Sequence, residues 1–267
     1  MAQETSQPSN WGKRIDRQPA LREAVAIYRE ICGDSLIAFY ARGSAHRGEA
    51  VFGLSDLDDV AYVTQLLSDE ALERLYALSD ARLEPWGLTG KRGLGRPRTL
   101  DWQTWGRPDA SDEESLRYKG ATFSLSYDAT RVYGQDVLLG YSIPVPDAAF
   151  AREYLRTGPL ETIRLATGGK RHREFPLPEE PEARLRKLGR LAVLSGAMVL
   201  IARSQFRSLR GPHVLPVLET AEPRWTGFLQ DTARCYIEVQ PDAPDYDPYL
   251  GTLAQFAEWC WQEVSES

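Results

Sequence analysis

The fold of this chain is decided by residues 43–63, which open with Gly43-Ser44-Ala45-His46-Arg47-Gly48-Glu49 and close with Ser55-Asp56-Leu57-Asp58-Asp59-Val60-Ala61-Tyr62-Val63. The apolar residues 36–40 before them predict a short buried strand. Gly43-Ser44 would end that strand and begin a helix with Ser44 as its N-cap. Residues 60–63 predict a second strand. Because side chains alternate along an extended chain, Asp56 and Asp58 should share one side while Leu57 enters the core.

The two aspartates indicate a cation site. Two carboxylates on one side of a strand repel each other unless a cation lies between them. Hard oxygen ligands suit Mg²⁺, which takes its other ligands from water and substrate phosphates. The pattern therefore points to nucleotide chemistry.

Together these motifs resemble the nucleotidyltransferase superfamily whose best-known member is DNA polymerase beta. The shared signature is Gly-Ser, a spacer of about a dozen residues, and then Asp-hydrophobic-Asp, present here as Gly43-Ser44 and Asp56-Leu57-Asp58. The sequel Arg47-Gly48-Glu49-Ala50 is most similar to the minimal and antibiotic-modifying branches, of which the aminoglycoside type is one. The resemblance implies an α+β fold, with a mixed α/β catalytic domain built on a small mixed sheet and a C-terminal helical bundle.

The resemblance also implies roles for individual residues. Asp56 and Asp58 would hold two Mg²⁺ ions, one on the nucleotide's phosphates and one on the acceptor hydroxyl. The nucleotide would be bound by Gly43, Ser44, Arg47 and Ser55, with Gly43 leaving room for a phosphate to approach the backbone. Arg47 has an alternative role in an ion pair with Glu49 or Glu30. Asp59 should face away from Asp58 and lie outside the site.

The superfamily adds a third carboxylate from a neighbouring strand, and Asp101 is the favoured candidate for this catalytic, metal-binding position. Residues 98–105 alternate as a half-buried strand would, which places Asp101 on the polar face. Asp128 and Asp136 are the rivals. Asp128 is interpreted as a turn residue before a strand at residues 130–133, and Asp136 belongs to a Tyr-Gly-x-Asp stretch at residues 133–136.

Length and composition fit two soluble domains. A chain of 267 residues with 42% hydrophobic and 26% charged residues can bury a sizeable core. The three cysteines are scattered without metal-binding spacing, which favours a reducing compartment. Neither a membrane-spanning run nor a signal-peptide pattern is seen, so we expect a cytoplasmic protein.

The chain is expected to divide into a disordered N-terminus (residues 1–18), a nucleotidyltransferase catalytic domain (19–144) and a C-terminal helical, substrate-binding domain (145–267). Helical periodicity predicts helices at residues 20–31, 69–83, 147–155, 160–167, 182–206, 224–239 and 249–264. The glycine-rich, basic residues 87–98 predict a loop beside the site, in which Lys91 or Arg92 would reach a phosphate unless the loop is simply solvated.

The expected function is Mg²⁺-dependent transfer of a nucleoside monophosphate from a nucleoside triphosphate, ATP being the expected donor. The acceptor would be a hydroxyl of a small molecule, such as an aminoglycoside-like antibiotic or a biosynthetic intermediate, and pyrophosphate would be released. Alternatives are transfer to tRNA or to a protein hydroxyl, as in toxin–antitoxin relatives, and a non-catalytic nucleotide- or partner-binding member of the fold. The net charge of −6 makes nucleic acid the weaker partner. The protein would be a monomer or a homodimer.

Overall fold

The structure is a computed structural model that describes residues 13–88, 94–101, 103, 111–170, 177–238 and 244–267. The chain forms two compact units, which are separated in sequence between Pro144 and Val145. No helix in the described part of the chain is long and apolar enough to cross a membrane.

The first unit is built on a three-stranded antiparallel sheet. Its strands are β1 (Leu36–Arg42), β2 (Asp59–Val63) and β3 (Ala129–Gly134), in the order β2-β1-β3. Arg98 adds a single parallel bridge to Tyr62 at the outer edge of β2. The predicted α+β class with a small sheet is confirmed.

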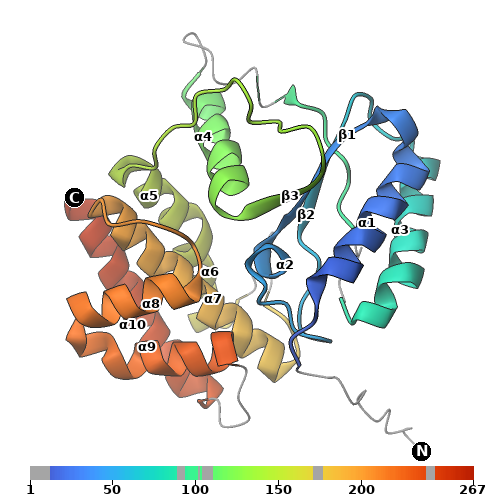
Figure 1. The fold of residues 1–267 in the computed structure, drawn as a ribbon. Coiled ribbons are helices and arrows are strands. Elements are labelled where there is room, and N and C mark those ends of the chain that lie inside the picture. The colour runs from blue at the N-terminus through green and yellow to red at the C-terminus, as the bar shows by residue number, and fades with distance from the viewer. Residues whose placement is uncertain (1–12, 89–93, 102, 104–110, 171–176, 239–243) are drawn as a thin grey trace, which may run out of the picture. The chain divides into compact units, whose positions relative to one another are not determined.

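Helices cover both faces of this sheet. α1 (Arg17–Cys32) and α3 (Asp69–Leu83) lie on one side and α4 (Asp112–Tyr127) lies on the other, as Figure 1 shows. The predicted helix at residues 69–83 is confirmed at both ends, and the Ser68 side chain caps it by accepting a hydrogen bond from the Ala71 amide (3.3 Å).

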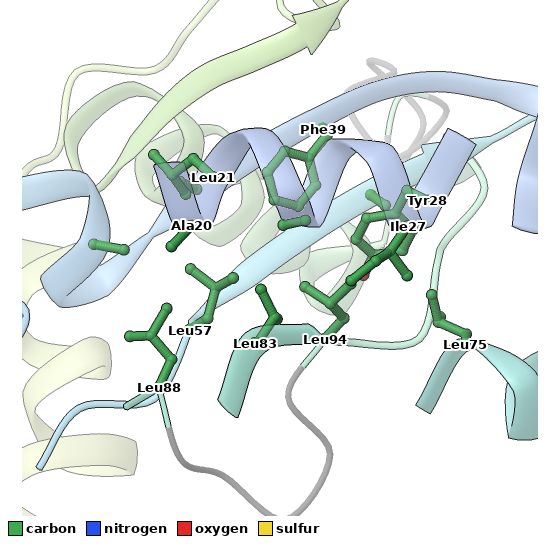
Figure 2. Close-up of a cluster of buried hydrophobic side chains, with 14 of the residues drawn as sticks. Ala20, Leu21, Ile27, Tyr28, Phe39, Leu57, Leu75, Leu83, Leu88 and Leu94 are labelled. Atoms are coloured by element: carbon green, nitrogen blue, oxygen red, sulfur yellow. The ribbon is translucent and has the colours of Figure 1, made fainter. Parts of the chain in front are cut away.

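Alternation along the strands divides the core in two. Phe39, Ala41, Leu57, Ala61 and Val63 pack with α1 and α3 in the larger cluster, part of which is drawn in Figure 2. Their neighbours on the opposite face pack with α4, and include Ala38, Tyr40, Val60, Tyr62, Tyr118 and Leu125. Leu57 therefore enters the core as expected.

Two expectations for the first unit are wrong. Residues 13–18 are not disordered, because Ile15 donates to the Ala50 carbonyl (3.1 Å) and α1 begins at Arg17; residues 1–12 lie outside the described residues. Of the strand expected at residues 98–105, the described residues 98–101 and 103 form only the bridge at Arg98. Thr99 donates to the Asp101 carboxylate (2.6 Å) and Gln103 donates to the Leu100 carbonyl (3.0 Å), so local turns replace the strand pairing.

The second unit is helical. Its α-helices are α5 (Ala148–Leu155), α6 (Glu161–Thr167), α7 (Pro181–Ala202), α8 (Gly211–Ala221), α9 (Thr226–Thr232) and α10 (Tyr246–Glu266). A π-helical turn at Arg156–Leu160 joins α5 to α6, another at Ala233–Glu238 follows α9, and a short 3₁₀ turn lies at Pro223–Trp225. The first unit has 3₁₀ turns at Gly33–Ser35 and Glu84–Trp86. The expected break at residues 157–159 is thus a π turn that contains Pro159.

α7 is the centre of this unit, as its apolar sequence predicted, and it packs against α5, α8 and α10. It ends at Ala202 rather than at residue 206, because Ser204 takes a positive φ of 56° that closes the helix. α4 and α8 were not expected from the sequence.

Candidate functional site

The Gly-Ser motif lies where β1 ends. β1 stops at Arg42, and Gly43 begins the short helix α2 (Gly43–Arg47). The Arg42 amide donates to the Asp58 carbonyl (2.7 Å), which fixes the end of β1 beside the start of β2. Two motifs separated along the chain therefore meet at one corner of the sheet.

Gly43 and Asp58 touch at this corner. Gly43 has a φ of +57°, which side chains other than glycine rarely adopt. A Cβ at Gly43 would lie 2.1 Å from Oδ2 of Asp58, far closer than van der Waals contact. The sequence pattern predicts that the missing side chain at Gly43 leaves room for a phosphate. In the structure, the Asp58 carboxylate occupies that space.

Asp56 and Asp58 flank the buried Leu57 and are both exposed. The alternation expected from the sequence is therefore present, with two carboxylates presented outside the core by one extended segment. Exposed carboxylate oxygens are the donors that Mg²⁺ prefers. This donor set fits a divalent cation.

Ser55 serves the turn before the pair. It is buried, and its Oγ accepts a hydrogen bond from the Val51 amide (2.9 Å) while its own amide donates to the Val51 carbonyl (3.0 Å). The predicted nucleotide contact by Ser55 is not supported, because its side chain holds the turn. Ser44 is half-buried, and its carbonyl accepts from the Glu49 amide (2.9 Å).

Arg47 is buried in an ion-pair cluster. Its guanidinium binds Glu49 (2.6 Å) and Asp128, and its side chain is only 4% exposed. Arg47 therefore does not reach towards a nucleotide as predicted, and the alternative of an ion pair with Glu49 is confirmed. Asp128, a rival for the third carboxylate, is held by the same guanidinium.

Further contacts secure α2 on both sides. The His46 Nδ1 lies 2.6 Å from the Thr130 hydroxyl of β3. Arg17 donates to the carbonyls of Ala45 (2.6 Å) and His46, and Arg14 donates to the Gly48 carbonyl (3.0 Å). These arginines bind the end of α2 where its carbonyls lack helical partners.

Asp59 faces away from Asp58, as expected, and enters a hydrogen-bond cluster that no sequence pattern signals. Its Oδ2 lies 2.5 Å from the Tyr28 hydroxyl, and its Oδ1 accepts from the Gly95 amide (2.7 Å). The Tyr28 hydroxyl also lies 2.7 Å from the Gly95 carbonyl. Burial raises the pKa of Asp59 to about 6, against the lowering effect of the hydrogen bonds from Tyr28 and Gly95. We call Tyr28, Asp59 and Gly95 the edge cluster.

Asp101 lies towards the opposite end of β2 from Asp58. The Arg98 amide donates to the Ala61 carbonyl and the Val63 amide donates to the Arg98 carbonyl, both at 2.9 Å, so the segment runs parallel to β2. Arg98 is level with Tyr62, and Tyr62 lies four residues, or about 13 Å, along β2 from Asp58. Asp101 follows Arg98 in the chain. Among the described residues, no group of three or more His, Cys, Asp or Glu is placed to hold a metal ion. The structure thus does not bring Asp101 together with Asp56 and Asp58.

The other predicted candidates have local roles or lie outside the described residues. Asp136 accepts from the Tyr40 hydroxyl (3.3 Å) and the Leu138 amide (3.0 Å), which places it in a turn after β3. Lys91 and Arg92 fall in a segment that the structure does not describe.

Comparison with known proteins gives a match in structure only, since no family model and no curated relative matches the sequence. A crystal structure of spectinomycin adenyltransferase AAD(9) from Enterococcus faecialis, with ATP and spectinomycin, aligns with a TM-score of 0.56 and 13% identity. The alignment covers 92% of this chain and 99% of that one. A toxin–antitoxin structure with AMP-PNP aligns over 43% of this chain and 74% of its own, at 15% identity and a TM-score of 0.29, too low to support an argument. The chain shares the fold of that spectinomycin adenyltransferase, as the resemblance of the motifs led us to expect.

Proposed function

We propose that the protein is a nucleotidyltransferase that moves a nucleoside monophosphate from a nucleoside triphosphate to a hydroxyl of a small molecule and releases pyrophosphate. ATP is the proposed donor. The observation that carries the proposal is the contact between Gly43 and Asp58, which places the Gly-Ser turn directly against a metal-binding type of carboxylate. The shared fold supports it, because the structural neighbour is an adenyltransferase whose structure contains ATP and spectinomycin.

Asp56 and Asp58 are the residues proposed to hold Mg²⁺, with two ions expected. When bound, Mg²⁺ would neutralise charge on the phosphates and lower the pKa of the acceptor hydroxyl. The chain's own contribution is positional. The buried Leu57 fixes the extended segment between the two carboxylates, and the bond from the Arg42 amide to the Asp58 carbonyl fixes the pair beside Gly43 and Ser44.

The phosphates are proposed to bind at Gly43 and Ser44, where the chain turns from β1 into α2. This turn is preorganised, because the cluster of Arg47, Glu49 and Asp128 holds the far end of α2. A preorganised turn needs little rearrangement when the nucleotide arrives, which favours binding. The helical unit, residues 145–267, is proposed to be the domain that binds the acceptor molecule.

The proposal is tested with the full-length protein in two steps. Calorimetric titration with ATP, GTP, CTP and UTP, with and without Mg²⁺, should show metal-dependent binding. Transfer of label from [α-³²P]ATP is then measured against a panel of spectinomycin, aminoglycosides, other metabolites and tRNA. Asp58→Asn should abolish both the metal dependence and the transfer, whereas Asp80→Asn, an exposed aspartate on α3, should change neither. Nucleotide binding that is identical with and without Mg²⁺ and in Asp58→Asn would refute the proposal.

A further inference from the structure

A cavity of about 470 Å³ lies beside the edge of β2, and Asp59 and Gly95 of the edge cluster are part of its wall. Its lining includes Arg96, Arg98, Thr99, Asp101, Tyr62 and Ala121. Arg98 is level with Tyr62, which places this part of the cavity about 13 Å along the strand from Asp58. We call it the edge cavity.

The backbone that carries the two arginines is held at both ends. Gly95 is bound through its amide to Asp59 (2.7 Å) and through its carbonyl to Tyr28 (2.7 Å) in the edge cluster. Arg98 is bound through its amide and its carbonyl to β2, both at 2.9 Å. Arg96 lies between these two fixed points, so both arginines project from a segment with little freedom to move.

The two guanidinium groups are exposed, and within the described residues neither forms an ion pair, a side-chain hydrogen bond or a ring contact. This is unusual in a chain with more acidic than basic residues (38 against 32). Two cations that line one cavity repel each other, and an anion that binds both relieves that repulsion.

Two carboxylates, Asp59 and Asp101, line the edge cavity, and in the described part of the chain neither forms an ion pair with Arg96 or Arg98. Asp59 directs both of its oxygens into the edge cluster. Asp101 accepts a hydrogen bond from the Thr99 hydroxyl (2.6 Å). The lining of the cavity thus contains two arginines and two aspartates, Asp59 and Asp101. Guanidinium forks match the geometry of phosphate or carboxylate oxygens.

We propose that the edge cavity binds an anionic group, phosphate or carboxylate, through Arg96 and Arg98. The proposal does not depend on the transfer reaction, because it concerns residues separate from the Asp56–Asp58 pair. The group has two possible sources, the phosphate tail of a nucleotide or the acid group of another small ligand.

The test uses the full-length protein and inorganic phosphate, followed by ³¹P NMR line broadening without Mg²⁺, with succinate as the carboxylate probe in calorimetry. The double variant Arg96→Gln/Arg98→Gln should weaken binding by about tenfold or more, because two charge-assisted contacts are lost. The matched control is Arg22→Gln/Arg74→Gln, which removes two exposed arginines from α1 and α3 and should bind as the wild type does. Arg98→Lys should fall between the two, since it keeps the charge and loses the fork.

Two further measurements show where the anionic group comes from and whether the edge cavity is independent of the Asp56–Asp58 pair. If the double variant also loses affinity for ATP, the group is the nucleotide's phosphate tail. If ATP affinity is unchanged while phosphate or succinate binding is lost, the group belongs to another ligand. Asp58→Asn should retain phosphate binding, so a failed transfer reaction leaves this result standing. Equal binding of phosphate, succinate and ATP by the wild type and the double variant, or no binding of phosphate and succinate with ATP unaffected, would overturn the proposal.

Discussion

Gly43 and Asp58 are so close that the position of a single missing methyl group at Gly43 is already occupied by the Asp58 carboxylate. A Cβ added there would be 2.1 Å from Oδ2, and the φ of +57° disfavours any other residue independently. A glycine that follows a strand is often explained by a turn alone. Here it also determines where a proposed metal ligand can lie.

Gly43→Ala should therefore both destabilise the fold and impair nucleotide binding. Backbone strain and the displaced carboxylate should lower the free energy of unfolding by about 1–3 kcal/mol. Urea denaturation and ATP titration measure the two effects. Gly120→Ala is the control, because Gly120 lies inside α4 with open space around its Cα and should gain roughly 0.5–1 kcal/mol. Wild-type stability and ATP affinity in Gly43→Ala would show that the contact is not maintained in solution.

Asp56→Asn and Asp58→Asn should each reduce turnover by on the order of a hundredfold or more, because metal stabilisation of the transition state is worth several kcal/mol. Both side chains are exposed, so the thermal midpoint without Mg²⁺ should hold or rise as repulsion between the carboxylates is relieved. Steady-state kinetics and calorimetry check this. Near-normal turnover in either variant would disprove its assignment as a metal ligand.

Asp101→Asn should leave turnover close to that of the wild type, because Asp101 follows Arg98, which is level with Tyr62 and so about 13 Å along β2 from the proposed metal ligand Asp58. The sequence alone predicted a strong loss for this variant, as a third metal ligand. The structure reverses that expectation because Asp101 follows Arg98 towards the far end of β2. A loss as large as that of Asp58→Asn would mean that Asp101 reaches the pair in the reacting enzyme.

Arg47→Met should cost about 3–5 kcal/mol in the free energy of unfolding, because it leaves the Glu49 and Asp128 carboxylates without their buried counter-charge. Guanidinium chloride denaturation measures this loss. Arg82→Met provides the comparison, since Arg82 pairs with Glu23 and Glu30 while its side chain is 33% exposed. Its loss should cost less than about 1 kcal/mol. Similar costs in the two variants would contradict this distinction between buried and exposed ion pairs.

Asp59→Asn should stabilise the protein near neutral pH. The folded pKa of about 6 lies above the ordinary value of 3.8, so the folded state binds the proton more tightly than the unfolded state does. Stability should therefore fall as the pH rises from about 4 to 6 and stay level above that, a loss of roughly 2–3 kcal/mol attributable to this group.

An asparagine at position 59 removes that loss and preserves the hydrogen bonds. Its amide can donate to the Tyr28 oxygen, the Tyr28 hydroxyl can donate to the Gly95 carbonyl, and the Gly95 amide can still donate to the asparagine oxygen. Unfolding curves from pH 4 to 8 should show a smaller slope between pH 4 and 6 for Asp59→Asn than for the wild type. An unchanged slope would assign the pH dependence to other groups.

The elements with strong local signals were predictable from the sequence. β1 and β2 follow from apolar runs, and α3 follows from helical spacing behind a capping serine at Ser68. α4 and α8 were not predictable, for different reasons. α4 lacks a clear apolar stripe, whereas α8 carries Pro212 at its start and Pro216 inside.

The site was predictable only where one short segment contains it. Asp56, Leu57 and Asp58 alternate as the sequence required, because their geometry is local. Arg47 was misassigned because its partner Asp128 lies 81 residues away in the chain. Asp101 was placed on a strand from its alternating pattern, whereas the Gln103 amide bonds to the Leu100 carbonyl and turns the chain there.

The strand order β2-β1-β3 also has a consequence for how the first unit folds. β1 pairs on one side with β3, so that Phe39 faces Tyr133, a partner that leaves the ribosome more than ninety residues later. Until then β1 exposes an unpaired edge, and closing so long a loop costs entropy before the pairing contributes anything. The unit should therefore complete its sheet late during synthesis, and chains that stop before residue 129 should remain prone to pair with one another along β1.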